Sequence, residues 1–197
     1  MGKQTESIDN SLFQHFLSST GYTENELNFR THYGIDNPAI NTRIFSSDKF
    51  GNIKIPYYTI EGEILKYSNG DKLRDFQRIR LKEPKNDGQK YSQPKGSGSQ
   101  IYFPPYIIEK YRNQEETPIL HITEGEKKAL AGCKKLNLPF VSIPGIHGFK
   151  ETDFQGKKIN NDLEKLIVKC NIKTLVFHMD ADALLCKYDI NNPDKDL

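Results

Sequence analysis

Acidic side chains follow two short apolar segments in the second half of the chain. The sequence contains Ile119-Leu120-His121-Ile122 followed by Thr123-Glu124-Gly125-Glu126, and later Thr174-Leu175-Val176-Phe177 followed by His178-Met179-Asp180-Ala181-Asp182. If these acids meet in the fold, each close pair of carboxylates repels by roughly 4 kcal/mol at a surface-like dielectric constant. A cation must then compensate them, or some of them must stay protonated. Oxygen ligands without nearby cysteines favour Mg²⁺ or Mn²⁺ over Zn²⁺. The pattern therefore predicts a divalent-metal site of the kind that phosphoryl transfer uses.

Two buried parallel strands would have to position these acids. Short apolar runs rich in Ile, Val and Phe, with helix-like segments between them, are typical of the sheet of an α/β protein. We expect a helix over residues 126–136, a strand over residues 138–143 and a second helix over residues 158–169. The inner faces of these helices are expected to hold Ala129, Leu130 and Cys133 in the first and Ile159, Leu163, Leu166 and Ile167 in the second. Because open α/β sheets bind ligands beyond the carboxyl ends of their strands, the acids are expected at one edge.

The order of these motifs resembles the TOPRIM domain, and more closely the primase-like TOPRIM domains of phage, plasmid and mobile-element replication proteins. The resemblance rests on Glu124-Gly125-Glu126-Lys127-Lys128-Ala129-Leu130, on Pro144-Gly145-Ile146-His147-Gly148-Phe149 and on Phe177-His178-Met179-Asp180-Ala181-Asp182. It implies that Glu124, Asp180 and Asp182 are the catalytic residues and the ligands of Mg²⁺ or Mn²⁺, with Glu126 beside them. Many members of the family have an acid four residues after the first glutamate, where this chain has Lys128.

A structural interpretation of the same acids stays open at this stage. Aspartate is a favoured N-cap, so Asp180 or Asp182 would then only begin a helix. Glu124 would be an ordinary acid at the end of a strand.

Basic charge is concentrated in the segment before this acidic region. Residues 66–112 carry 11 basic and five acidic side chains, although the whole chain has a net charge of only +2. Such a concentration indicates a polyanion partner, since phosphate contacts supply most of the sequence-independent affinity for nucleic acids. A solvated basic face is the alternative. The candidate contacts to nucleic acid or nucleotide are Arg78, Arg80, Lys90, Lys95, Lys127 and His147.

Two features of the basic segment suggest how it would hold phosphates. Strand alternation over residues 75–81 places Arg78 and Arg80 on one face. The loop of residues 90–98, Lys-Tyr-Ser-Gln-Pro-Lys-Gly-Ser-Gly, has small residues and backbone amides suited to a phosphate backbone, and a flexible linker has the same composition. TOPRIM relatives carry a similar stretch before the acidic domain.

The N-terminal part is predicted to be an α+β region. Residues 8–19 have the apolar spacing of an amphipathic helix that ends at Gly21. Residues 52–60 and 63–67 are predicted to form a β-hairpin, with a further turn at Asn69-Gly70. We expect a strand over residues 101–103 and a helix from Pro105. The domain boundary is placed in the polar connector after residue 112, which gives domains of residues 1–112 and 113–197.

Composition excludes several classes of protein. No apolar run approaches the roughly 20 residues of a membrane span, and the first ten residues lack a secretory pattern. The three cysteines have no Cys-x-x-Cys spacing, which argues against a zinc module and for reduced thiols in a cytoplasmic protein.

Together these observations predict an α/β protein: an N-terminal α+β region followed by a TOPRIM-like Rossmannoid parallel sheet flanked by helices. We expect that sheet to be incomplete, because only 15 residues follow Asp182. The resemblance implies a primase-like nucleotidyltransferase that synthesises RNA primers on a DNA template during replication of a phage, plasmid or mobile element. Its expected partners are single-stranded DNA, nucleoside triphosphates and a helicase in cis or in trans, with no membrane. The alternatives are a metal-dependent nuclease or strand cleaver, and a non-catalytic accessory protein that binds nucleic acid.

Overall fold

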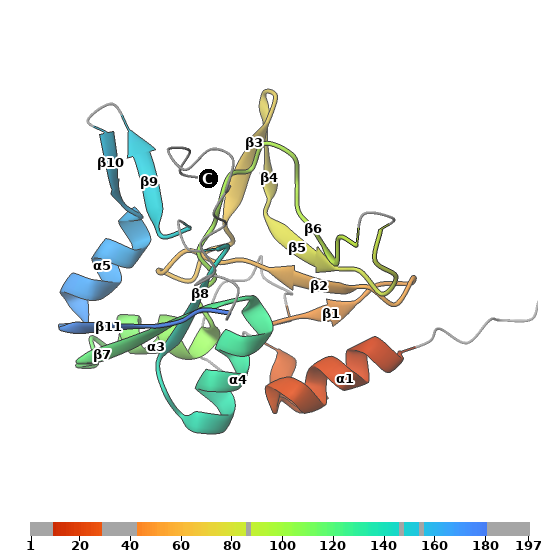
Figure 1. Ribbon diagram of the computed structural model, residues 1–197, viewed down its shortest axis with the longest axis horizontal. Helices are drawn as coiled ribbons and strands as arrows, with labels where there is room; N and C mark the ends of the chain where they lie inside the picture. Colours follow the sequence, from red (N-terminus) through yellow and green to blue (C-terminus); the bar gives the residue numbers. More distant parts are fainter. Residues whose placement is uncertain (1–9, 29–42, 86–87, 146–147, 154–155, 181–197) are drawn as a thin grey trace, which may run out of the picture.

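A computed structural model of the 197-residue chain describes residues 10–28, 43–85, 88–145, 148–153 and 156–180. The chain forms a three-stranded parallel sheet, three antiparallel sheets and the helices around them (Figure 1). This arrangement confirms the predicted mixed α/β fold, with antiparallel strands in the N-terminal part and a parallel sheet after it. Within the described residues, no helix has both the length and the apolar character that a membrane span requires.

The first helix, α1 (Ser11–Thr20), confirms the amphipathic segment near the N-terminus. Its buried residues are Phe13, Phe16, Leu17 and Thr20. Gly21 ends the helix as predicted, since its φ of 82° lets its N–H donate to the carbonyl of Leu17. The 3₁₀ helix η1 (Glu24–Leu27) follows. The Phe16 ring packs edge-on against Phe45, with 4.7 Å between ring centroids, which anchors α1 on the N-terminal core.

The N-terminal strands form two antiparallel sheets. The larger has the order β1 (Ser46–Ser47), β2 (Ile53–Pro56), β5 (Gln77–Arg80), β6 (Tyr91–Ser92). The smaller is the hairpin of β3 (Lys66–Asn69) and β4 (Lys72–Asp75). This hairpin closes at the predicted Asn69-Gly70 turn, where Gly70 has a φ of 61°.

The predicted hairpin of residues 52–60 with 63–67 is much shorter than expected. Its two arms share one isolated bridge, Tyr58 to Ile64. Strand β3 pairs with β4 instead, and β2 pairs with β5. The buried Phe76 lies where the strands change partners: its carbonyl accepts from the Tyr57 N–H and its N–H donates to the Leu65 carbonyl, while the Leu65 N–H donates directly to the Tyr57 carbonyl.

The parallel sheet has the order β11 (Thr174–His178), β7 (Ile119–Glu124), β8 (Phe140–Ile143). Leu120 and Ile122 of the central strand are fully buried. The predicted strand over residues 101–103 is reduced to a single antiparallel bridge between Tyr102 and Ser142 of β8. Helix α3 (Pro105–Arg112) begins at the proline, as predicted.

Helix α4 (Glu126–Leu136) lies where the sequence predicted it and buries Ala129, Leu130 and Cys133. The next predicted helix begins later than expected. Residues 156–159 belong to β10 (Gly156–Ile159), which pairs with β9 (Lys150–Asp153), and helix α5 (Asn161–Lys169) follows. The reason is Asn160, whose side chain accepts hydrogen bonds from the N–H groups of Asp162 and Leu163 and so sets the first turn.

This cap leads to a first prediction about stability. Asn160→Ala is expected to lower the free energy of unfolding by about 1 kcal/mol, since two helix N–H groups lose their acceptor. Asn10→Ala is the matched control, because Asn10 is the N-cap residue of α1 but makes no capping hydrogen bond through its side chain. Urea unfolding of both variants measures the difference, and equal losses would contradict the assignment.

The two parts of the chain are joined by side chains as well as by one continuous hydrophobic core. Lys134 of α4 forms an ion pair with Glu26 at 2.6 Å, and hydrogen bonds from Lys134 and then from Thr23 lower the pKa of Glu26 to about 2. Lys135 donates to the Ser18 carbonyl of α1. The domain boundary after residue 112 therefore stays a prediction, since the core includes residues on both sides of it.

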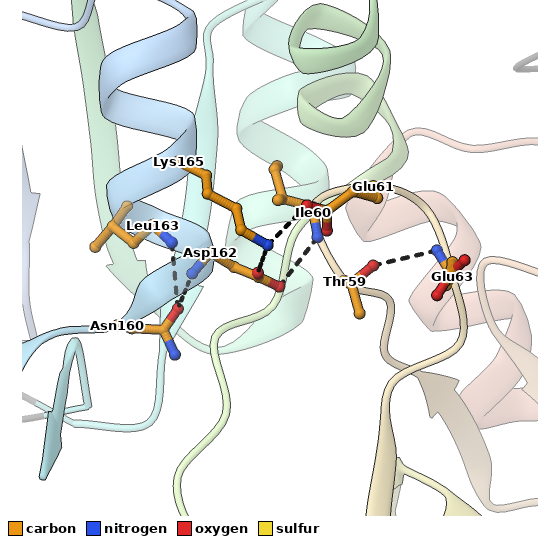
Figure 2. A network of polar contacts seen from close by, with 8 residues as sticks. All are labelled: Thr59, Ile60, Glu61, Glu63, Asn160, Asp162, Leu163 and Lys165. Carbon is orange, nitrogen blue, oxygen red and sulfur yellow. Dashed lines mark hydrogen bonds and ion pairs between the residues drawn. The ribbon is translucent and has the colours of Figure 1, made fainter. Parts of the chain in front are cut away.

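A polar network makes the second connection, between the turn after β2 and the start of α5 (Figure 2). Asp162 accepts from the Ile60 N–H at 3.2 Å. Lys165 lies 2.8 Å from Glu61 and 3.3 Å from Asp162. The hydrogen bond to Glu61, followed by its other contacts with these carboxylates, outweighs burial and raises the pKa of Lys165. The network fixes α5 against the N-terminal part.

Candidate active site at the edge of the parallel sheet

Strands β7 and β11 carry the predicted acids to the same edge of the sheet. The two strands are parallel and in register, with His178 opposite Thr123. Glu124 is the last residue of β7, and Asp180 follows β11 by two residues. Thr123 also donates from its hydroxyl to the His178 carbonyl at 3.1 Å, which ties the two strand ends together. The structure therefore places Glu124 and Asp180 at one edge.

The turn after Glu124 sets the direction of helix α4. Gly125 has a φ of 83° and a ψ of 135°, a backbone conformation that side chains with a Cβ rarely adopt. This turn starts α4 immediately beyond the sheet edge. As a result, Lys127 and Lys128 lie in the first turn of the helix, next to the acids.

Lys128 contacts the Asp180 carboxylate directly, through an ion pair between Nζ and Oδ1. About half of each side chain is exposed, 49% for Lys128 and 53% for Asp180. The basic residue that stands where many TOPRIM domains have an acid is therefore a neighbour of a predicted metal ligand. Sequence spacing alone could not show this contact, because the partners are 52 residues apart.

The donor chemistry at this edge fits a hard divalent ion. Glu124 and Asp180 supply carboxylate oxygens and are not fully buried, so an ion in solution can reach them. Among the described residues, no group of three or more His, Cys, Asp or Glu side chains is positioned to hold a metal. Asp182, the third predicted ligand, lies outside the described residues, as does His147.

Comparisons with known proteins give two matches. Residues 108–191 match a family model described as a domain of unknown function (DUF3854), which spans less than half of the chain. The solved structure titled "Structure of the DnaG primase catalytic domain bound to ssDNA" is similar, with a TM-score of 0.44 and 14% sequence identity over 88% of this chain. The aligned part is 56% of that longer chain. No curated protein matches the sequence.

Arg78, one of the predicted phosphate contacts, is engaged inside the protein. Its guanidinium lies 2.8 Å from Glu126, whose side chain is completely buried at the start of α4. The Tyr57 hydroxyl donates to the same Glu126 oxygen at 2.5 Å. Burial disfavours the charge of Arg78, but the Glu126 carboxylate and then Tyr57 and Tyr91 together outweigh burial, so the pKa of Arg78 is raised. This ion pair joins β5 to the helix that follows Glu124.

The Tyr57 phenol completes this buried cluster. Burial, followed by the negative charge of Glu126, raises the pKa of Tyr57 well above its usual value. Tyr57 therefore keeps its proton and acts as a donor. Two atoms of the cluster, Glu126 Oε2 and Arg78 Nε, are buried without a hydrogen-bond partner among the described residues. Sequence reasoning put Glu126 beside the metal site, and it missed this ion pair.

The remaining basic candidates are Arg80, Lys90, Lys95 and Lys127. Arg80 shares a face of β5 with Arg78, as strand alternation predicted. The guanidinium carbons of Arg78 and Arg80 lie 4.9 and 5.2 Å from the centroid of the Tyr91 ring. Arg80 also donates to the Lys90 carbonyl at 3.1 Å. Lys90 and Lys95 are exposed, and Lys127 is half-buried. Contact of any of these residues with nucleic acid stays a prediction.

The loop of residues 93–100 has internal hydrogen bonds. The buried Ser97 donates its hydroxyl to the Pro94 carbonyl at 2.7 Å, and Gln100 donates to the Ser97 carbonyl at 2.8 Å. Gln93 donates to the Gly98 carbonyl. These bonds give the loop a defined shape, which the alternative interpretation as a flexible linker does not predict.

A pair of histidines lies on the sheet near the same edge. His121 Nδ1 and His178 Nε2 are 2.8 Å apart, and the His121 ring stacks on Phe140 at 4.7 Å. Burial, and then the neighbouring His178, lowers the pKa of His121, which favours its neutral form. The buried Cys133 of α4 donates from its thiol to the Phe140 carbonyl, and burial raises the pKa of this thiol to about 12. This agrees with a packing role for Cys133, since a nucleophile needs the thiolate.

Proposed function

We propose that this protein is a metal-dependent, primase-like nucleotidyltransferase that synthesises RNA on a single-stranded DNA template. The observation that carries the proposal is the in-register parallel pairing of β7 and β11, because it brings Glu124 and Asp180 to one sheet edge. The ordered motifs that resemble primase-like TOPRIM domains support the same assignment. Replication of a phage, plasmid or mobile element is the expected setting.

The positions of Glu124 and Asp180 at the sheet edge support their proposed roles, and the resemblance to TOPRIM domains supplies that of Asp182. Glu124 and Asp180, with Asp182, would hold Mg²⁺ or Mn²⁺. The bound ion would supply charge neutralisation at the reacting phosphate and a lower pKa for the attacking 3′ hydroxyl. Thr123 holds the two strand ends together, and Gly125 turns the chain so that α4 starts beside them.

Phosphate binding is assigned to the exposed Lys90 and Lys95 and to the half-buried Arg80 of the N-terminal part. Arg80, Lys90 and Lys95 would contact the template or the nucleotide, since they lie on or beside the sheet of β5 and β6. Arg78 is half of a buried ion pair, so its proposed part is to support this sheet from within. Lys127, in the first turn of α4, and His147 are proposed as further contacts with nucleotide or nucleic acid.

The experiment is primer synthesis by the whole 197-residue chain on single-stranded DNA with labelled ribonucleotides and Mg²⁺ or Mn²⁺. Glu124→Gln and Asp180→Asn are each expected to reduce synthesis by about 100-fold or more, because each removes a charged ligand of the ion. Asp182→Asn is expected to do the same. Glu109→Gln on the exposed side of α3 is the matched control and should retain activity.

Other outcomes would overturn the proposal in distinguishable ways. Metal-dependent cleavage of labelled DNA without synthesis would identify a nuclease that uses the same acids. Binding of DNA without metal, with neither synthesis nor cleavage, would identify an accessory protein. Undiminished synthesis in Glu124→Gln and Asp180→Asn would show that this edge is not the active site.

A further inference from the structure

The ion pair between Lys128 and Asp180 is the starting observation. Asp180 is one of the two acids that the described part of the chain brings to the sheet edge, and the Lys128 ammonium occupies its Oδ1. A carboxylate oxygen that holds an ammonium group is not free to bind a metal ion in the same position. A divalent ion that binds this Oδ1 must therefore displace the Lys128 ammonium.

Helix formation does not account for a lysine at this position. Lys128 lies in the first turn of α4, where the helix dipole disfavours positive side chains. The last turn, where a cation is favoured, already has Lys134 and Lys135. The ion pair with Asp180 therefore offsets the unfavourable interaction of the Lys128 charge with the helix dipole.

Charge explains what this contact does. Without a cation, Glu124 and Asp180 repel each other across the sheet edge. The Lys128 ammonium supplies one positive charge there, so the edge can form before any ion arrives. The same charge repels an incoming divalent ion, and the repulsion is only partly screened at distances shorter than the Debye length of about 8 Å at physiological salt.

We propose that Lys128 is a displaceable counter-cation of the metal site, which competes with the divalent ion for Asp180 and so weakens metal binding. The inference rests on the proposed function, since it assumes that Glu124 and Asp180 hold a metal. It adds a specific residue that sets the metal affinity of the site, and it concerns binding rather than turnover.

The test is calorimetric titration of the whole chain with Mn²⁺. Lys128→Gln is expected to bind Mn²⁺ on the order of tenfold more tightly than the unmodified protein, since one nearby positive charge is removed. Lys173→Gln is the matched control, because it removes the same charge from an exposed residue just before β11, at the opposite end of that strand from Asp180. Its Mn²⁺ affinity is expected to change by less than about twofold, since a strand of about 3.3 Å per residue puts Lys173 farther from Asp180 than the Debye length of about 8 Å. Circular dichroism confirms that each variant is folded.

A double-mutant cycle separates direct competition from a general charge effect. In an Asp180→Asn background, Lys128→Gln is expected to lose most of its effect on Mn²⁺ affinity, because the competed carboxylate is gone. An equal gain in both backgrounds would overturn the proposal, as would unchanged or weaker binding in Lys128→Gln alone. If neither the unmodified protein nor Lys128→Gln binds Mn²⁺, the metal site itself is wrong and the proposed function fails with it.

Discussion

Replacing Glu126 with alanine is expected to lower the free energy of unfolding by about 3–5 kcal/mol. The side chain is completely buried and accepts from both Arg78 and Tyr57. Without it, Arg78 keeps a charge inside the protein with no carboxylate to compensate it. A buried charge that loses its partner is among the costliest single changes a protein can undergo.

Chemical denaturation monitored by circular dichroism would measure this effect. Glu124→Ala is the control, two residues earlier and only half-buried, and it should change stability by less than about 1 kcal/mol. The double variant Glu126→Leu with Arg78→Met removes both charges. It should lower the free energy of unfolding by less than Glu126→Ala alone, since no unpaired charge remains. A small effect of Glu126→Ala would contradict the buried ion pair that the structure shows.

Gly132→Ala in α4 is expected to destabilise the protein by about 1–3 kcal/mol. A Cβ at this position would lie 2.3 to 2.7 Å from three atoms of the Phe140 ring. In an exposed helix the same change stabilises by up to about 1 kcal/mol, because alanine favours the helix more than glycine does. The expected sign is therefore opposite to the one that helix propensity predicts.

The partner residue provides the control for this prediction. Phe140→Leu removes the ring that the new methyl group would contact. In the Phe140→Leu background, Gly132→Ala should lower the free energy of unfolding by less than it does in the unmodified protein. Thermal unfolding of the unmodified protein, the two single variants and the double variant would give this difference as a coupling energy. Stabilisation by Gly132→Ala alone would show that α4 does not approach β8 as closely as described.

Local sequence patterns predicted most of the helices and the positions of the parallel strands along the chain. Helices α1, α3 and α4 were predictable because their apolar spacing, Gly21 and Pro105 act through neighbouring residues. The start of α5 was misplaced, since apolar spacing continues through Ile159 while the Asn160 cap and the pairing of β10 with β9 decide where the helix begins.

Strand pairing in the N-terminal part was harder to predict from sequence. The Asn69-Gly70 turn was correct because glycine there favours a tight hairpin. The partners of β2 and β3 were not predicted correctly, since strand pairing depends on contacts with segments that are distant in the sequence. That choice is made by the core as a whole and leaves little trace in the strands themselves.

Apolar runs and helical spacing are local properties, so they were sufficient to predict that each acidic motif follows a strand of a parallel sheet. Which charges meet depends instead on how the elements pack in three dimensions. Arg78 pairs with Glu126 across 48 residues of sequence, and Lys128 pairs with Asp180 across 52. Nothing in the composition of either segment distinguishes these partners from the other charged residues nearby. Ion pairs between distant residues are selected by the packing of whole elements, in which β5 and the end of β11 come to lie beside the first turn of α4.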